Sequence, residues 1–89
     1  MKQCTLKISG RVQGVFFRAN AREQALLLGL TGYAKNLPDG SVECLVQGTE
    51  GDIEGFTLWC RNGSTDAEVT GLAVDYQELE KPIVGFETY

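Results

Sequence analysis

Histidine is absent from this 89-residue chain, and its absence excludes several kinds of catalytic site. Without histidine there is no Ser–His or Cys–His nucleophile pair and no imidazole ligand for a metal ion. The three cysteines, Cys4, Cys44 and Cys60, form no C-x-x-C pair. Their spacing therefore excludes zinc-binding and thioredoxin-type redox motifs.

Long apolar runs are also missing. No charge-poor segment approaches the roughly 18–20 apolar residues that a membrane span requires. The segment from Met1 to Lys7 lacks the uninterrupted apolar stretch of a secretory signal. A length of 89 residues suits one small domain, residues 1–89, with a modest core. We expect a soluble, cytoplasmic protein with no membrane partner.

Positive charge is scarce and lies mostly in the N-terminal part of the chain. The formal net charge is −4, which disfavours a general attraction to nucleic acid or to anionic membranes. Residues 1–36 carry six basic side chains and one acid, whereas residues 37–89 carry two basic and eleven acidic side chains. This asymmetry fits either an ordinary solvated surface or a locally positive anion site on an acidic body.

Alternation of apolar residues and helical spacing divide the chain into short elements. Cys4 and Cys44 share the parity of neighbouring apolar residues, so both are predicted to face the core. A Cys4–Cys44 disulfide remains possible if their strands are neighbours, but free thiols are the favoured interpretation. Strands are expected over residues 4–9, 31–36, 42–47, 68–78 and 83–89, helices over 18–28 and 52–62, and turns over 37–40 and 80–82.

This order, βαββαβ with an extra C-terminal strand, indicates an α+β fold, the ferredoxin-like split βαβ sandwich. An antiparallel-dominated sheet would carry two helices on one face, and right-handed crossovers would place the central strands together. The turn after the first strand and the end of the second strand could then lie at one sheet edge. Arg18 and Asn36 could therefore approach each other. The fold alone decides no function.

The segment Gly10–Arg18, GRVQGVFFR, is the clearest candidate for a functional site. A turn between a strand end and a helix start gathers unpaired backbone N–H groups at the positive end of the helix dipole, which favours an anion. Arg18 adds a planar cationic fork that suits phosphate oxygens. The segment contains neither a Walker A nor a dinucleotide-binding pattern. It predicts a small phosphate pocket built without metal, and its alternative is an ordinary connection with an exposed arginine.

Asn36 is the second candidate because it precedes the turn signal Leu37–Gly40. Its amide either satisfies local backbone groups or holds a water molecule for attack on phosphorus. Phe16 and Phe17 are predicted core residues, although Phe16 is also a candidate for lining the pocket.

Three blocks of sequence resemble the acylphosphatase family in register: GRVQGVFFR at 10–18, LGLTGY at 28–33 and NLPDGSVE at 36–43. The similarity extends over the whole chain and is weakest over residues 64–82. Three linked blocks are far more specific than any one of them. The long cysteine-rich extensions of larger proteins, in which a similar domain serves hydrogenase maturation, are missing. The resemblance therefore indicates a small free-standing acylphosphatase that works as a monomer.

The resemblance implies hydrolysis of the carboxyl–phosphate bond of small acylphosphates to carboxylate and inorganic phosphate, with no metal or organic cofactor. It implies that Arg18 and the loop amides bind the phosphoryl oxygens and that Asn36 positions the water. The phosphate-binding residues implied are Gln13, Gly14, Val15, Phe16, Phe17 and Arg18. Because an acylphosphate has a good leaving group, positioning and charge stabilisation can carry much of the catalysis.

Two rival interpretations remain. The first is a non-catalytic ferredoxin-like module that binds a small anion or RNA. An RNA-binding relative would display aromatic residues on an open sheet and a basic face, and this sequence offers neither clearly. The second is a degenerate domain that serves only as a structural partner, against which the intact Arg18 and Asn36 argue.

Overall fold

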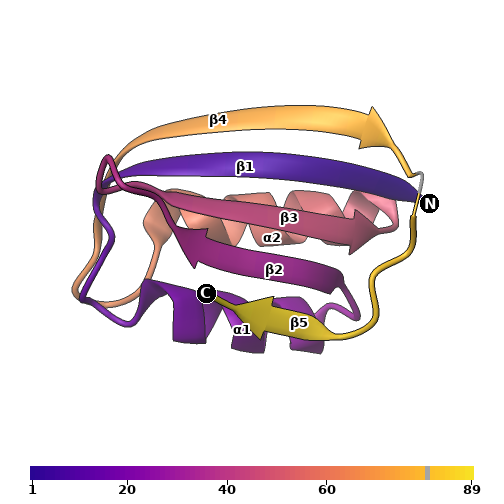
Figure 1. Cartoon of the computed structure of the whole chain (residues 1–89), viewed down its shortest axis with the longest axis horizontal. Helices are drawn as coiled ribbons and strands as arrows, with labels where there is room; N and C mark the ends of the chain where they lie inside the picture. Colours follow the sequence, from indigo (N-terminus) through magenta and orange to yellow (C-terminus); the bar gives the residue numbers. More distant parts are fainter. Residues whose placement is uncertain (80) are drawn as a thin grey trace.

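A five-stranded sheet with two helices on one face makes up the part of the chain that the computed structural model describes, residues 1–79 and 81–89 (Figure 1). The described order confirms the predicted βαββαβ pattern with an extra C-terminal strand, and with it the ferredoxin-like fold. The elements are β1 (Lys2–Arg11), α1 (Phe17–Leu27), β2 (Thr31–Asn36), β3 (Val42–Gly48), α2 (Glu50–Asn62), β4 (Glu68–Glu78) and β5 (Phe86–Thr88).

The sheet runs in the order β4-β1-β3-β2-β5, so β1 and β3 lie together at its centre as expected. Strand β1 pairs antiparallel with both β3 and β4, whereas β5 pairs parallel with β2. The alternation of apolar and polar residues determines the register of the strand. If the pairing shifted by one residue, the apolar side chains would turn from the core toward solvent. Cys4, Leu6 and Ile8 accordingly have no exposed surface.

Apolar residues at helical spacing bury one face of each helix, as predicted. In α1 the buried residues are Phe17, Ala21 and Ala25, and Gly29 follows the helix with a φ of 72°. Helix α2 begins at Glu50, two residues before the predicted start, because the Thr49 hydroxyl accepts a hydrogen bond from the Asp52 N–H at 3.3 Å. Neither of these two described helices is long and apolar enough to cross a membrane.

The prediction for the last strand is wrong in its extent. A strand was expected over residues 83–89, but β5 covers only Phe86–Thr88. Gly85 has a φ of 77°, which interrupts an extended chain, and Val84 just before it is 94% exposed. The alternation of Val84 with Phe86 thus continues into a segment that lies outside the strand. The turn predicted over residues 80–82 includes position 80, which lies outside the described residues.

A bulge lies between β1 and β4, close to the loop that follows β1. The register shifts between Ser9 and Gly10, so that Ser9 lies opposite Gly71 and Gly10 lies opposite Val69. Gly10 has a φ of 119°, and a Cβ at this position would collide with the carbonyl oxygen of Glu68. The extra residue is Thr70 of β4, so the bulge bends β4, the strand that carries it. On β1, Gly10 lies just before the candidate phosphate loop.

The three cysteines are buried free thiols, which confirms the favoured interpretation. Cys4 lies opposite Val46 and Cys44 opposite Leu6, so the two cysteines are diagonal neighbours and not a directly opposed pair. Burial raises the pKa of the Cys4 thiol to about 11. Because the thiolate is the reactive form, this raised pKa favours the unreactive thiol of Cys4 at neutral pH.

Candidate active site

The loop between β1 and α1 has two residues in left-handed backbone conformations. Gly14 has a φ of 76°, and Phe16, at the N-cap of α1, has φ 62° and ψ 22°. For a residue with a side chain this conformation costs roughly 1–2 kcal/mol. Successive backbone N–H groups in such turns form concave sites that bind anions. The loop therefore has the backbone geometry of an anion site.

The backbone N–H groups of this loop are available as donors. Within the described part of the chain, no N–H of residues 13–18 donates a hydrogen bond to a protein acceptor outside regular helix and strand pairing. The structure describes every residue in the first turn of α1, and none of them has an acidic side chain that would neutralise the helix dipole. These donors lie at the positive end of α1, which suits a bound phosphate.

A cavity of about 300 Å³ lies at this loop and at the start of α1. It combines one cationic side chain, Arg18, with mostly apolar neighbours, and β5 contributes Thr88. Its lining residues are Val12, Gly14, Phe16, Phe17, Arg18, Ala19 and Thr88. Four of the predicted phosphate-binding residues are among them, whereas Gln13, Val15 and Asn36 are not. A volume near the lower end of ligand pockets suits a small substrate.

Arg18 and Asn36 meet at one atom, the main-chain oxygen of Tyr89. The Arg18 guanidinium donates to this oxygen through Nη1 at 2.6 Å, and the Asn36 backbone N–H donates to it at 3.1 Å. The predicted approach of these two residues is therefore confirmed, although 18 positions separate them in the sequence. The contact also brings in Tyr89, which the sequence did not indicate. Asn36 is exposed at the end of β2, so its side-chain amide is accessible.

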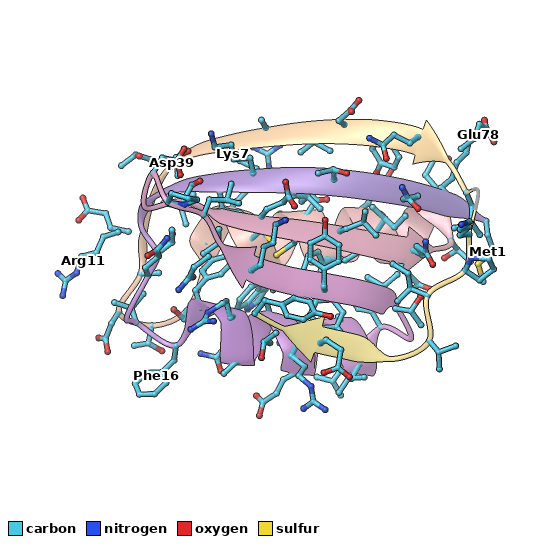
Figure 2. All side chains as sticks on the ribbon, in the orientation of Figure 1. Met1, Lys7, Arg11, Phe16, Asp39 and Glu78 are labelled. Atoms are coloured by element: carbon cyan, nitrogen blue, oxygen red, sulfur yellow. The ribbon has the colours of Figure 1, made fainter. Side chains whose placement is uncertain are left out.

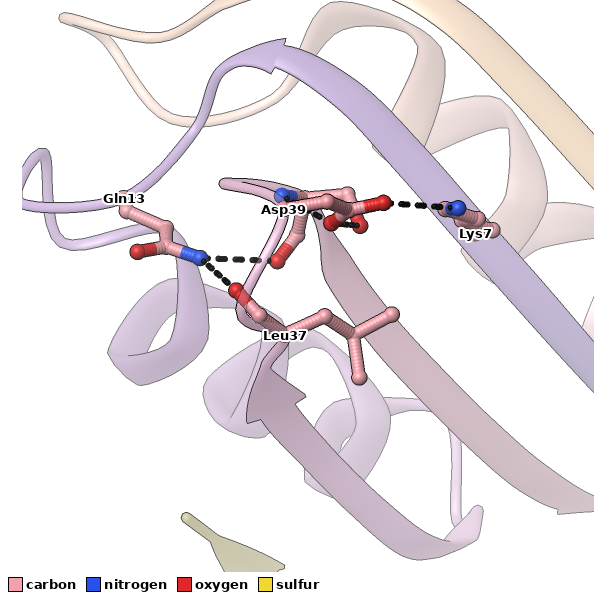
Figure 3. A network of polar contacts seen from close by, with 5 residues as sticks. Lys7, Gln13, Leu37 and Asp39 are labelled. Atoms are coloured by element: carbon pink, nitrogen blue, oxygen red, sulfur yellow. Dashed lines mark hydrogen bonds and ion pairs between the residues drawn. The ribbon is translucent and has the colours of Figure 1, made fainter.

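The Gln13 side chain and the Val15 backbone carbonyl hold the loop in place. The Gln13 amide nitrogen donates to the carbonyl oxygens of Leu37 at 2.8 Å and Ser41 at 2.9 Å, which ties the loop to the turn after Asn36 (Figure 3). The Val15 carbonyl accepts a hydrogen bond from the Ser64 hydroxyl at 2.8 Å. Ser64 was missed because it lies 49 residues away and no local pattern marks it.

The two consecutive phenylalanines have opposite environments. The Phe17 ring is 1% exposed and packs on Trp59 with ring centroids 5.1 Å apart, which confirms its place in the core. Phe16 is 76% exposed, so the prediction that it belongs to the core is wrong. The alternative prediction placed Phe16 in the lining of a phosphate pocket, and Phe16 does line the cavity beside the loop. Burying one ring fixes where α1 starts and leaves the other ring outside.

Asp39 stabilises the turn that follows Asn36. Its carboxylate accepts a hydrogen bond from the Ser41 N–H at 3.0 Å and pairs with the Lys7 ammonium at 2.8 Å (Figure 3). Lys7 first, and then Ser41, hold the pKa of Asp39 well below its ordinary value of 3.8. The predicted hairpin geometry of Asp39-Gly40 is confirmed by the antiparallel pairing of β2 with β3.

Replacing Asp39 with asparagine is expected to lower the free energy of unfolding at pH 7. Because folding lowers the pKa of Asp39, its ionised form contributes stability that is fully present above pH 3.8 and is lost as the pH falls through the folded-state value. The difference between wild type and Asp39→Asn should therefore shrink below about pH 4. Urea unfolding at pH 7, 4 and 2.5 measures this difference in the free energy of unfolding. Lys7→Gln should remove part of the same pH dependence, and a difference that stays constant with pH would contradict this assignment.

Sequence and structure comparisons identify the family to which these residues belong. A model of the acylphosphatase family matches residues 4–88. The chain belongs to the acylphosphatase family. It is 45% identical over 87 residues to the acylphosphatase of Thiobacillus denitrificans, with 98% of this chain and 96% of that protein covered. It is 42% identical over 86 residues to the acylphosphatase of Rubrobacter xylanophilus, with 97% of this chain and 78% of that protein covered.

The fold agrees with that of a solved acylphosphatase. The crystal structure of the Bacillus subtilis acylphosphatase superimposes with a TM-score of 0.97 at 34% identity, covering 100% of this chain and 99% of that one. Membership of the acylphosphatase family does not favour the rival interpretation, a non-catalytic binding module. The roles of individual residues rest on the geometry described above and are proposed below.

Proposed function

We propose that this acylphosphatase hydrolyses small acylphosphates at the cavity beside the β1–α1 loop. The observation that carries the proposal is the set of free N–H donors in residues 13–18 at the positive end of α1, next to the Arg18 guanidinium. Phosphoryl oxygens of the substrate accept hydrogen bonds from these amides and from Arg18. A guanidinium has five N–H donors, so the bond from Arg18 to Tyr89 leaves others for the substrate.

Asn36 acts on the other reactant, the water molecule. Its amide oxygen accepts a hydrogen bond from the water and its NH₂ group can donate one, which orients the water toward phosphorus. The bond between water oxygen and phosphorus forms while the bond from phosphorus to the carboxylate oxygen breaks. The leaving group departs as a carboxylate, which needs no general acid.

The proton of the attacking water passes to an oxygen of the substrate phosphate. The chain contains no histidine, and the described residues that line the cavity include no carboxylate to serve as a general base. Arg18 and the loop amides stabilise the charge on the equatorial oxygens as the transfer proceeds. Gln13 supports both halves of the site, because its side chain joins the phosphate loop to the turn that follows Asn36.

A titration with inorganic phosphate, followed by ¹H–¹⁵N NMR, tests the phosphate site directly. We expect the largest amide shifts at residues 13–18, because their N–H groups would donate to the bound anion. Amides at the C-terminal end of β4, residues 74–78, pair with the start of β1, at the other end of that strand from the loop, and serve as the internal control. Shifts centred anywhere other than the β1–α1 loop would refute this placement of the phosphate.

The proposal also covers cofactors, assembly and location. We propose that the enzyme needs neither a metal ion nor an organic cofactor, and that it works as a cytoplasmic monomer without binding nucleic acid. The good leaving group of an acylphosphate supports catalysis without a metal ion, and the net charge of −4 disfavours binding to nucleic acid. Hydrolysis should survive dialysis against EDTA, and light scattering should give a mass near 9.7 kDa.

A further inference from the structure

Phe16 has a conformation and an exposure that the fold does not explain. It is the one described residue other than glycine with a positive φ, and its ring is 76% exposed. Glycine or asparagine adopts this backbone conformation more readily. Because the Phe16 ring is exposed, it does not stabilise the hydrophobic core. Phe17 already anchors the start of α1 by packing on Trp59. Residues in such sparsely populated conformations concentrate at functional sites.

The position of Phe16 links it to the proposed phosphate site. Phe16 lines the same cavity as Arg18 and Thr88. Its ring projects away from the body of the molecule at the end where the loop lies (Figure 2). With the phosphoryl group held by the loop amides and Arg18, the rest of the substrate must extend along the cavity lining, to which this exposed ring belongs.

We propose that the ring of Phe16 is the contact surface for the acyl group of the substrate, so that the enzyme prefers acylphosphates with apolar, above all aromatic, acyl groups. This inference rests on the proposed function, because it needs the phosphoryl group to lie at the loop. The cavity has one cationic side chain and is otherwise lined mainly by apolar residues, which suits a ligand with an anionic head and an apolar tail. An aromatic acyl group would stack on the ring and cover surface that is otherwise exposed.

The test compares benzoyl phosphate with acetyl phosphate, which share the reacting bond and differ in the acyl group. In Phe16→Asn, the asparagine tolerates the left-handed backbone while the ring is removed. We expect the ratio of kcat/KM for benzoyl phosphate to that for acetyl phosphate to fall about tenfold. Phe16→Leu should keep part of the preference, because it retains apolar surface. The Ki of benzoylphosphonate should rise relative to that of acetylphosphonate, which reports binding without turnover.

Leu27→Ala is the matched control. Leu27 is an exposed apolar residue of α1 that lies outside this cavity, so its removal should leave the substrate ratio unchanged. A wild-type ratio retained in Phe16→Asn would overturn the inference and leave the proposed function intact. An equal loss for both substrates, with weaker inhibition by inorganic phosphate, would also overturn it, because Phe16 would then act only through the loop backbone. If inorganic phosphate does not inhibit the wild type, the proposed site itself is wrong.

Discussion

Arg18→Ala is expected to lower kcat/KM for a small acylphosphate by about 10³-fold, the scale seen when a charged group that stabilises a transition state is removed. Arg18 is the one cationic side chain among the described residues that line the cavity. Alanine therefore removes both the charge and the forked donors that we propose bind the phosphoryl oxygens. Binding of inorganic phosphate should weaken as well, because the product presents the same oxygens. Steady-state hydrolysis of benzoyl phosphate and phosphate inhibition measure the two effects.

Two further variants distinguish this role from a general effect of charge. Arg11→Ala removes the same charge from an exposed position at the end of β1, and it should change kcat/KM by less than about threefold because solvent screens it. Arg18→Lys keeps the charge but loses the planar fork, so it should recover only part of the activity. Thermal unfolding of Arg18→Ala detects any loss of stability from the missing bond to Tyr89. Equal losses in Arg11→Ala and Arg18→Ala would refute a specific role for Arg18.

Asn36→Ala is expected to lower kcat by about 10²-fold while the Ki of inorganic phosphate changes by less than about twofold. The reason lies in the roles proposed above, in which Asn36 orients the water and the loop amides and Arg18 bind the phosphate. The backbone N–H of residue 36 bonds to the Tyr89 oxygen, and the alanine variant keeps that bond. Its effect should therefore be confined to the side-chain amide.

Asn62→Ala provides the comparison for Asn36→Ala, because Asn62 is an exposed asparagine at the end of α2. It should leave kcat unchanged. A large rise in the phosphate Ki of Asn36→Ala would place Asn36 in the phosphate site and remove its role in positioning water. An unchanged kcat in Asn36→Ala would refute the role in positioning water, and Asn36 would then only stabilise the turn.

Local sequence patterns were enough to predict most of the helices and strands. Apolar residues alternate at Cys4, Leu6 and Ile8 because only one face of the sheet is buried. Gly29 has the left-handed backbone conformation that ends α1. The prediction failed at β5, because pairing there depends on where β2 runs. The alternating pattern continues to Val84, but the strand begins only after Gly85 turns the chain.

Part of the candidate site lay beyond any local pattern. The loop and Arg18 stood out because a strand, glycines and a helix start are adjacent in sequence, and the resemblance to acylphosphatases supplied the roles. Ser64, Thr88 and Tyr89 carried no such signal. Tyr89 contacts Arg18 across 71 positions, and Ser64 reaches Val15 across 49. Contacts of this kind exist only after the crossovers of the fold bring distant segments together.

The sequence by itself determined the order of elements, the family and the type of donors in the loop, because these depend on residue type and short-range spacing. Only the tertiary structure decided which groups meet. Phe16 and Phe17 show the difference, since they are identical neighbours in the sequence. The packing of Phe17 against Trp59 determines which ring enters the core, and the left-handed backbone at residue 16 leaves the other ring beside the cavity. A pattern of residue types cannot make that choice, because it depends on what the rest of the chain places opposite each ring.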